Sequence, residues 1–174
     1  SDLDLGILYS SLQFPGFSLG GRWNLDAKID GTYARATRKV GLQKREQEYI
    51  ASIPKFDIKN TLTDGYFKLA DLPKGLDKIA YRLEAKDPDG KMKSASISIH
   101  DISVQALNNY IKGYVSITDF NKIAVQSDLK ALFNLADIKS FYPVKDIELA
   151  GLIDVNLNAK GYVDLKRNIF PETN

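Results

Sequence analysis

Alternation of apolar and polar residues is the feature that most constrains how this chain can fold. Trp23, Leu25, Ala27 and Ile29 are separated by polar residues, and the same spacing recurs at 56–62, 79–85, 94–107, 110–117, 122–132 and 153–159. Side chains two residues apart lie on the same face of a β-strand. Each run therefore predicts a strand with one apolar and one polar face, and the whole pattern is typical of an antiparallel β-protein.

Turn-forming residues lie between several of these runs. They are Asp64-Gly65, Asp87-Pro88-Asp89-Gly90 and Asn108-Asn109. Glycine and asparagine tolerate the left-handed backbone conformation that tight hairpins require, so each group predicts a division between two strands. Between Ile99 and Ile102 the apolar phase slips by one residue, which predicts a β-bulge at His100-Asp101.

Helical patterns are scarce. Residues 134–142 put Leu135, Ile138 and Phe141 on one helical face, and Pro143 ends the pattern. Residues 43–52 predict a further turn or two of helix. We therefore predict a mainly β fold, a strongly curved antiparallel sheet or open groove of alternating strands, with one or two short helices at its edges.

A repeat is visible without gaps when Gly21 is aligned with Gly151, which is an offset of 130 residues. Leu5 then matches Leu135, and both copies have the order helix, connector, glycine, alternating strand, glycine. This order predicts a repeat architecture. We divide the chain into 1–33, the end of a preceding repeat with a short helix and a strand, 34–53, a connector, and 54–174, a whole β repeat.

The residues of this repeat carry a family resemblance over roughly 54–163. The segments concerned are 134–143, 147–151 with the strand that runs to Lys160-Gly161, 54–58, 64–68, 71–73 and Ile79. In their order and spacing they resemble the C-terminal region of AsmA-family proteins, so 54–174 is interpreted as an AsmA-like β repeat. The first copy departs from the pattern, because Ile7 replaces the aspartate at the helix start.

The resemblance implies a large Gram-negative envelope protein, anchored by an N-terminal helix in the inner membrane and projecting into the periplasm. The family is associated with outer-membrane assembly and lipid homeostasis. Its members resemble bridge-like lipid-transfer proteins, in which long curved β-sheets form an apolar groove. The chain begins with Ser1 and has Met92 as its single methionine, so we interpret it as a fragment whose membrane contact comes from absent parts.

The charges of the chain do not predict nucleic-acid binding. The 24 lysines and arginines are offset by 22 aspartates and glutamates, and both signs are mixed along the sequence. The densest basic stretch, 35–45, is followed at once by Glu46 and Glu48, which is typical of a solvated loop. A nucleic-acid-binding protein concentrates its basic residues on one face or stripe, so we expect no nucleic-acid partner.

The sequence predicts no catalytic residue, no metal site and no cofactor. His100 is the only histidine and cysteine is absent, so a catalytic triad or a zinc site lacks its usual residues. Asp101 follows His100 directly, and adjacent strand residues point to opposite faces unless the bulge redirects one of them. Asp87-Pro88-Asp89-Gly90 begins like a calcium loop, but the later ligands of such a loop are missing. We interpret it as a turn.

The apolar side of the strands is the remaining candidate for function. The residues that we expect to line a lipid groove are Trp23, Leu25, Ile29, Ile79, Leu83, Ile153, Val155 and Leu157. The predicted helices are too short to cover a sheet of this size, which leaves two alternatives. The apolar face holds lipid, with phospholipid acyl chains as the expected ligand. Alternatively the sheet closes on itself as a sandwich, and the chain is a scaffold that contacts envelope assembly proteins.

Overall fold

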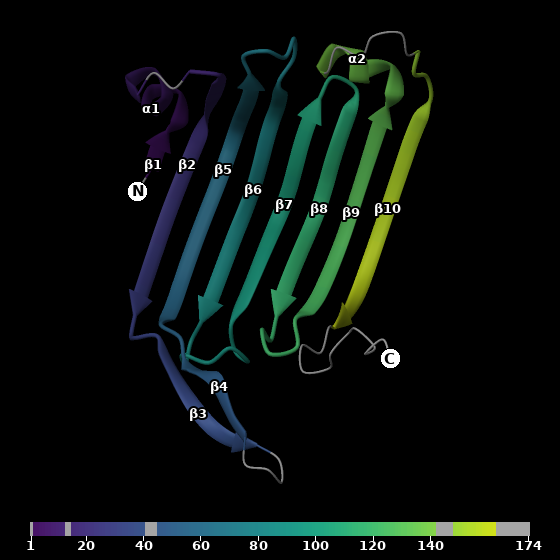
Figure 1. The fold of residues 1–174 in the computed structure, drawn as a ribbon. Coiled ribbons are helices and arrows are strands. Elements are labelled where there is room, and N and C mark those ends of the chain that lie inside the picture. Colours follow the sequence, from purple (N-terminus) through teal and green to yellow (C-terminus); the bar gives the residue numbers. More distant parts are fainter. Residues whose placement is uncertain (1, 13–14, 41–44, 142–147, 163–174) are drawn as a thin grey trace.

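A computed structural model describes residues 2–12, 15–40, 45–141 and 148–162. Its main element is one eight-stranded sheet in the order β1-β2-β5-β6-β7-β8-β9-β10, in which all neighbouring strands are antiparallel (Figure 1). The strands are β1 (Asp2–Asp4), β2 (Phe17–Asp30), β5 (Lys55–Leu69), β6 (Leu76–Asp87), β7 (Ser96–Ala106), β8 (Asn109–Thr118), β9 (Ala124–Asn134) and β10 (Leu152–Tyr162). The predicted fold class, a mainly β fold with a large antiparallel sheet, is confirmed.

A separate hairpin is inserted between β2 and β5. Its strands, β3 (Ala34–Val40) and β4 (Arg45–Ser52), form a two-stranded sheet of their own that projects beyond one end of the main sheet (Figure 1). The prediction of helical turns at 43–52 is therefore wrong for the described part of that segment. Lys39 lies directly opposite Glu46 in the register, and such opposite-charge pairs across two strands favour the hairpin.

The helices are short and lie where the sequence predicts them. α1 (Leu5–Leu12) follows β1, and a 3₁₀ turn, η1 (Leu135–Asp137), runs into α2 (Ile138–Phe141) after β9. The Asp4 carboxylate accepts hydrogen bonds from the backbone N–H groups of Gly6 and Ile7, at 2.9 and 3.1 Å. The Asn134 side chain accepts one from the Ala136 N–H at 3.1 Å. These caps satisfy N–H groups that a helix start leaves without partners.

The two ends of the described chain share several features. Each has a capped helix followed by a strand, and Gly21 and Gly151 have positive φ angles of 124° and 119°. Gly31 also has a positive φ, of 111°. Gly21 lies inside β2, however, whereas Gly151 precedes β10. The repeat and the division into 1–33, 34–53 and 54–174 stay predictions.

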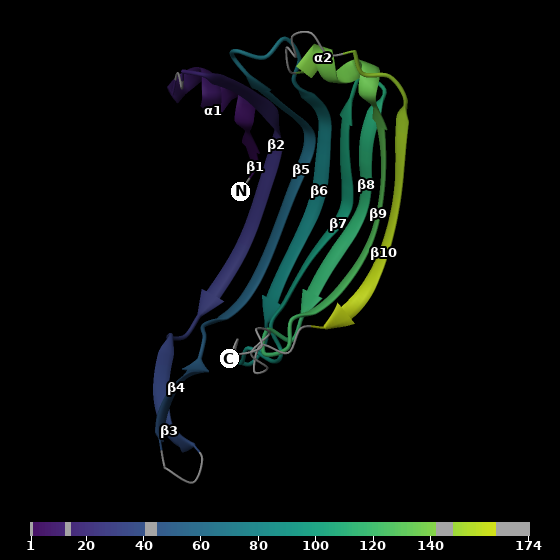
Figure 2. The same ribbon diagram turned by 45° about the vertical axis from the view of Figure 1, so that its right-hand side comes forward.

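All the long strands bend in the same direction (Figure 2). The pairing of neighbouring strands is also irregular. The register between β2 and β5 shifts between Gly20 and Arg22, and further shifts follow Leu62 on β5, Asp77 on β6 and Ile99 on β7. A β-bulge bends the strand that carries it and increases its local twist. Bulges on β5, β6 and β7 therefore contribute to the curvature of the sheet, while β8, β9 and β10 pair with one another without a register shift.

The sequence anticipated one of these bulges and misread another. The predicted bulge at His100-Asp101 is confirmed, and Asp101 has a φ of 54°. Asp64-Gly65, which predicted a division between two strands, instead lies inside β5, where Asp64 has a φ of 52°. A Cβ atom on Gly21 would lie 2.8 Å from the Cα of Gly65. The backbones of β2 and β5 therefore lie very close together here, and β5 continues through the bulge instead of turning.

The described chain has no closed hydrophobic core. Its buried apolar residues are all alanines, namely Ala85, Ala95, Ala106 and Ala131. The larger apolar side chains are half-buried or exposed. A single sheet with two short helices has no second layer to cover them, so they are shielded only by adjacent side chains on the same face. The sandwich with a closed core, which the alternative interpretation requires, is not formed by the residues that the structure describes.

Candidate functional site: the apolar concave face

The register brings apolar side chains from all the long strands onto one face of the sheet, which we call the apolar face. One row across it consists of Ala27, Ile58, Ala85, Ile97, Ile117 and Val125, which are paired in sequence from β2 to β9. A second row consists of Leu25, Asn60, Leu83, Ile99, Val115, Ser127 and Ala159. Because side chains alternate along each strand, these rows share a face and form one surface.

The predicted groove residues all lie on this face. Trp23, Leu25 and Ile29 are on β2, opposite Leu62, Asn60 and Phe56 of β5. Ile79 and Leu83 are on β6, in the middle of the sheet. Ile153, Val155 and Leu157 are on β10, opposite Phe133, Ala131 and Leu129 of β9. The structure thus places the predicted residues of β2, β6 and β10 on one surface, although β2 and β10 lie far apart across the sheet.

The apolar face is open to solvent near both edges of the sheet, on β2 and on β10. Ile29 on β2 is 66% exposed, and Val155 and Leu157 on β10 are 39% and 46% exposed. No second layer of described residues covers them (Figure 2). Scattered apolar residues on a surface are ordinary, whereas a contiguous exposed apolar surface usually marks an interaction or ligand-binding site.

The two helices lie at one end of this face, on the inner side of the bend (Figure 2). Beneath α2 is a hollow of about 330 Å³, which is lined by Leu76, Ala106, Asn109, Phe133, Leu135, Ile138, Phe141 and Ile153. At the β2 side the ring of Tyr9 from α1 lies 5.9 Å from that of Phe17, which in turn lies 6.1 Å from Phe67. Since the helices touch the apolar face from inside the bend, the apolar face is concave.

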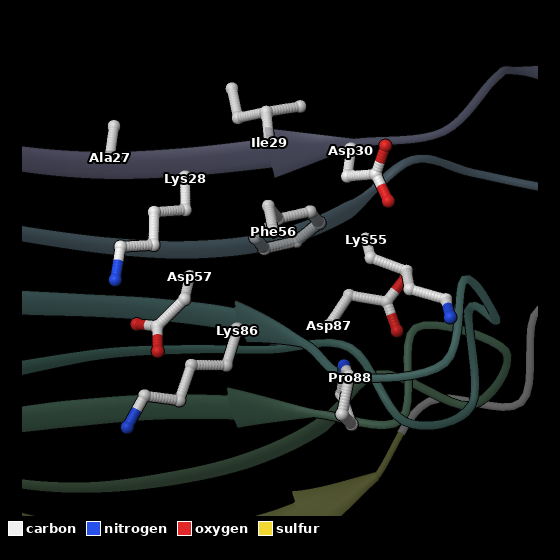
Figure 3. Close-up of a pocket in the computed structure, with 10 residues that line it drawn as sticks. All are labelled: Ala27, Lys28, Ile29, Asp30, Lys55, Phe56, Asp57, Lys86, Asp87 and Pro88. Carbon is white, nitrogen blue, oxygen red and sulfur yellow. The ribbon is translucent and has the colours of Figure 1, made fainter.

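The opposite, convex face is polar. Lys28, Asp57 and Lys86 form a cross-strand row on β2, β5 and β6, and the next row consists of Asp26, Lys59 and Glu84. Figure 3 shows Lys28, Asp57 and Lys86 extending away from Ala27 and Ile29. Cross-strand neighbours in each row have opposite charges, which favours the pairing of the strands. The sheet therefore separates a solvated surface from an apolar one.

Asp87 is the one large side chain that is fully buried, at 1% exposure, within the described chain. It lies opposite Phe56 (Figure 3). It is the last residue of β6, which ends on the side of the sheet away from the helices (Figure 1). Its Oδ1 atom accepts hydrogen bonds from the N–H groups of Asp89, Gly90 and Lys91 and from the Ser94 hydroxyl, at 3.1–3.3 Å. Asp87 thus holds together the loop between β6 and β7, which sequence reasoning identified only as a turn.

The lone histidine lies on the polar face. The His100 ring is stacked on that of Tyr114, with centroids 6.5 Å apart. The bulge turns Asp101 to the same side as Arg82, and the two form an ion pair of 3.2 Å. Within the described residues, no group of three or more His, Cys, Asp or Glu side chains is placed to hold a metal ion. No helix among them is long and apolar enough to span a bilayer.

Sequence reasoning missed much of the central part of the apolar face. Ile97, Ile99, Val115, Ile117 and Leu129 lie there as well. Ile138 and Phe141 of α2 line the hollow between that helix and the apolar face. The alternation that predicted strands at 94–107, 110–117 and 122–132 also marked these strand residues. What it could not indicate is that their faces join into one surface, because that depends on the register between strands.

Comparison with known proteins adds no relative. No protein family, no curated protein and no solved structure matches this chain.

Proposed function

We propose that this chain is a non-enzymatic segment of a periplasmic envelope protein, anchored in the inner membrane through parts outside the chain, that carries phospholipid acyl chains along its apolar face. The observation that supports the lipid-carrying role is the exposure of this concave, continuous apolar surface within a folded sheet. The compartment, the anchor and a role in outer-membrane assembly derive from the resemblance to the AsmA family alone.

The energy scale of the apolar face suits transient lipid binding. Each methylene removed from water contributes about 0.8 kcal/mol, so burying a 16-carbon chain gains on the order of 13 kcal/mol before ordering costs. A bilayer offers this gain in full, whereas an open sheet covers an acyl chain on one side and offers part of it. Lipid on the apolar face is therefore held less strongly than in a membrane, which lets it leave again.

The distribution of polar groups supports an acyl chain as ligand rather than a polar molecule. Two residues of the Leu25 row are polar, Asn60 and Ser127, and both are buried. The Asn60 amide donates a hydrogen bond of 2.9 Å to the backbone oxygen of Asn24. Its hydrogen-bonding capacity is therefore partly used within the sheet. A ligand on this face meets mainly hydrocarbon, while the charged rows face the other side.

A scaffold that contacts assembly proteins was the alternative function. That alternative assumed a closed sandwich core, whereas the described residues form an open sheet. An exposed apolar surface of this kind would have to be covered in a stable scaffold, because its contact with water is unfavourable. Lipid carriage is therefore the function that we favour.

Two measurements test the proposal. Native mass spectrometry of gently purified protein should detect co-purified phospholipid. Trp23, the only tryptophan, lies on the apolar face, so phospholipid with brominated acyl chains should quench its fluorescence. The same lipid without bromine is the control.

Absence of both co-purified lipid and bromine-dependent quenching would refute the proposal. Because no reaction is involved, the variant His100→Ala should load lipid as the unmodified chain does. Loss of loading in that variant, with the fold retained, would point instead to chemistry at the polar face.

A further inference from the structure

The edge strand β10 leaves one side of its backbone without a partner among the described residues. It pairs with β9 from Leu152 to Tyr162 without any register shift, and it lies at the end of the strand order. Proteins usually protect such edges with proline, bulges or short strands, because a free row of N–H and C=O groups can pair with another chain. β10 has 11 residues, no proline and no bulge.

The opposite edge of the sheet is different. β1 pairs with Arg22–Asn24 of β2 and so covers the middle of that strand. Gly21 of β2 also has a positive φ of 124°, which makes the edge of β2 irregular there. Of the two edges, β10 is the one that is long and regular, and no described strand pairs with its outer side over its full length.

We propose that β10 pairs antiparallel with β10 of a second copy of this chain, about a two-fold axis at Leu157. Leu157 is the midpoint of Leu152–Tyr162, so this register overlaps the two strands over their full length. In an antiparallel pair centred on Leu157, each residue faces the residue of the second copy that lies equally far from position 157 on the other side. Asp154 then faces Lys160 of the second copy, and Val155 faces Ala159.

The charges of β10 favour this register over its neighbours. Within the described part of the chain, neither Asp154 nor Lys160 has an ion-pair partner. In the register centred on Leu157, two symmetric Asp154–Lys160 pairs form, and opposite-charge cross-strand pairs are favourable. A centre one residue away would place Asp154 opposite Asn158 or Tyr162, and neither offers an opposite charge. Strand overlap and charge complementarity therefore point to the same alignment.

The pairing also keeps the two faces of the sheet distinct. Facing residues are both odd-numbered or both even-numbered, so Val155, Leu157 and Ala159 stay on the apolar side while Asp154, Asn156 and Lys160 stay on the polar side. The two sheets then form one larger sheet with a continuous apolar face. An isologous contact of this kind closes as a dimer and does not propagate into a fibre.

Charge reversal tests the register. Sedimentation velocity over a concentration series should show a monomer–dimer equilibrium for the 174-residue chain. Asp154→Lys places like charges opposite each other twice, so it should weaken dimerisation at least about tenfold. Lys160→Asp should have the same effect. The double variant Asp154→Lys/Lys160→Asp restores both pairs with reversed polarity, and it should dimerise like the unmodified chain.

Cross-linking tests the position of the two-fold axis. The chain has no cysteine, so a single introduced cysteine reports only on contacts between copies. Directly opposite residues have Cα atoms about 4.5–5.5 Å apart, which a disulfide can bridge. Leu157→Cys should therefore form disulfide-linked dimers rapidly. Ile153→Cys is the matched control, because Ile153 and Leu157 are both 46% exposed, yet the two Ile153 positions would be about 26 Å apart.

The results separate this inference from the proposed function. A chain that stays monomeric at all concentrations, a dimer unaffected by Asp154→Lys, or equal cross-linking of the two cysteine variants would overturn the β10 pairing. The inference goes beyond lipid carriage, and lipid loading is measured in parallel by native mass spectrometry. A monomeric Asp154→Lys variant that still carries lipid would support both the dimer contact and an independent lipid-binding face.

Discussion

Leu25 on β2 lies directly opposite Asn60 on β5, and Asn24 beside it faces the other side of the sheet. This pair of neighbours allows the same charge to be introduced on either face. Leu25→Asp places a carboxylate on the half-buried apolar face, where the open sheet lets it reach water. We expect the fold to be kept, with a stability loss of about 1–2 kcal/mol.

On a lipid-carrying face, the new carboxylate interrupts the hydrocarbon surface and is costly to desolvate under an acyl chain. Lipid loading of Leu25→Asp should fall at least about tenfold, as measured by native mass spectrometry. Asn24→Asp adds the same charge to the polar face and should load lipid normally. Unchanged loading in a folded Leu25→Asp protein would contradict lipid binding at this position.

The buried carboxylate of Asp87 leads to a prediction about stability. Asp87→Ala removes the acceptor of four hydrogen bonds and leaves their donors in the loop without it. Loss of such an acceptor should lower the free energy of unfolding by about 3 kcal/mol, measured by urea denaturation followed by circular dichroism. Asp57→Ala on the exposed face is the control and should cost little. Equal effects would mean that the Asp87 hydrogen bonds contribute no special stability.

Gly113 on β8 is predicted to tolerate no side chain. Its φ is 142°, and a Cβ atom there would lie 1.9 Å from the backbone oxygen of Asp128. Gly113→Ala must therefore push β8 and β9 apart, and it should destabilise the protein by more than about 3 kcal/mol. Gly161→Ala is a matched control in a strand, since nothing lies within 4 Å of the corresponding Cβ. Thermal melts of the two variants compare the effects, and a stable Gly113→Ala protein would mean that the β8–β9 pairing can readily shift.

Asp89 should make the loop between β6 and β7 sensitive to acid. The Ser94 hydroxyl donates to the Asp89 carboxylate and, with Lys91 adding to the effect, holds the pKa of Asp89 below its ordinary value. A carboxylate with a lowered folded-state pKa stabilises the fold above its unfolded-state pKa, and this contribution is lost as pH falls through the folded-state pKa.

Asp89→Asn should therefore reduce stability at neutral pH, and its difference from the unmodified chain should shrink as the solution becomes acidic. Urea midpoints measured across that pH range provide the test. A difference that does not change with pH would show that the ionised state of Asp89 does not contribute.

The sequence by itself determined the strands, their faces and part of their irregularity. Period-two spacing is a local property, so Val155 and Leu157 could be assigned to one face and Asn156 to the other without any knowledge of neighbouring strands. The bulge at His100-Asp101 was predictable because the apolar phase slips there. The short helix at 135–141 followed from local spacing as well, and the one at 5–12 from its match to that segment.

Only the tertiary structure decided how these strands combine. The residues Asp64-Gly65 suit a turn and a bulge equally well. In the structure Gly65 pairs with Ile79 of β6, so β5 continues through this point. The burial of Asp87 depends in the same way on its loop folding back. The bending of the sheet depends in part on bulges that lie on the neighbouring strands β5, β6 and β7. That alignment arises from the register between strands, which no single segment of the sequence determines. The apolar face is open because no second layer of described residues covers it.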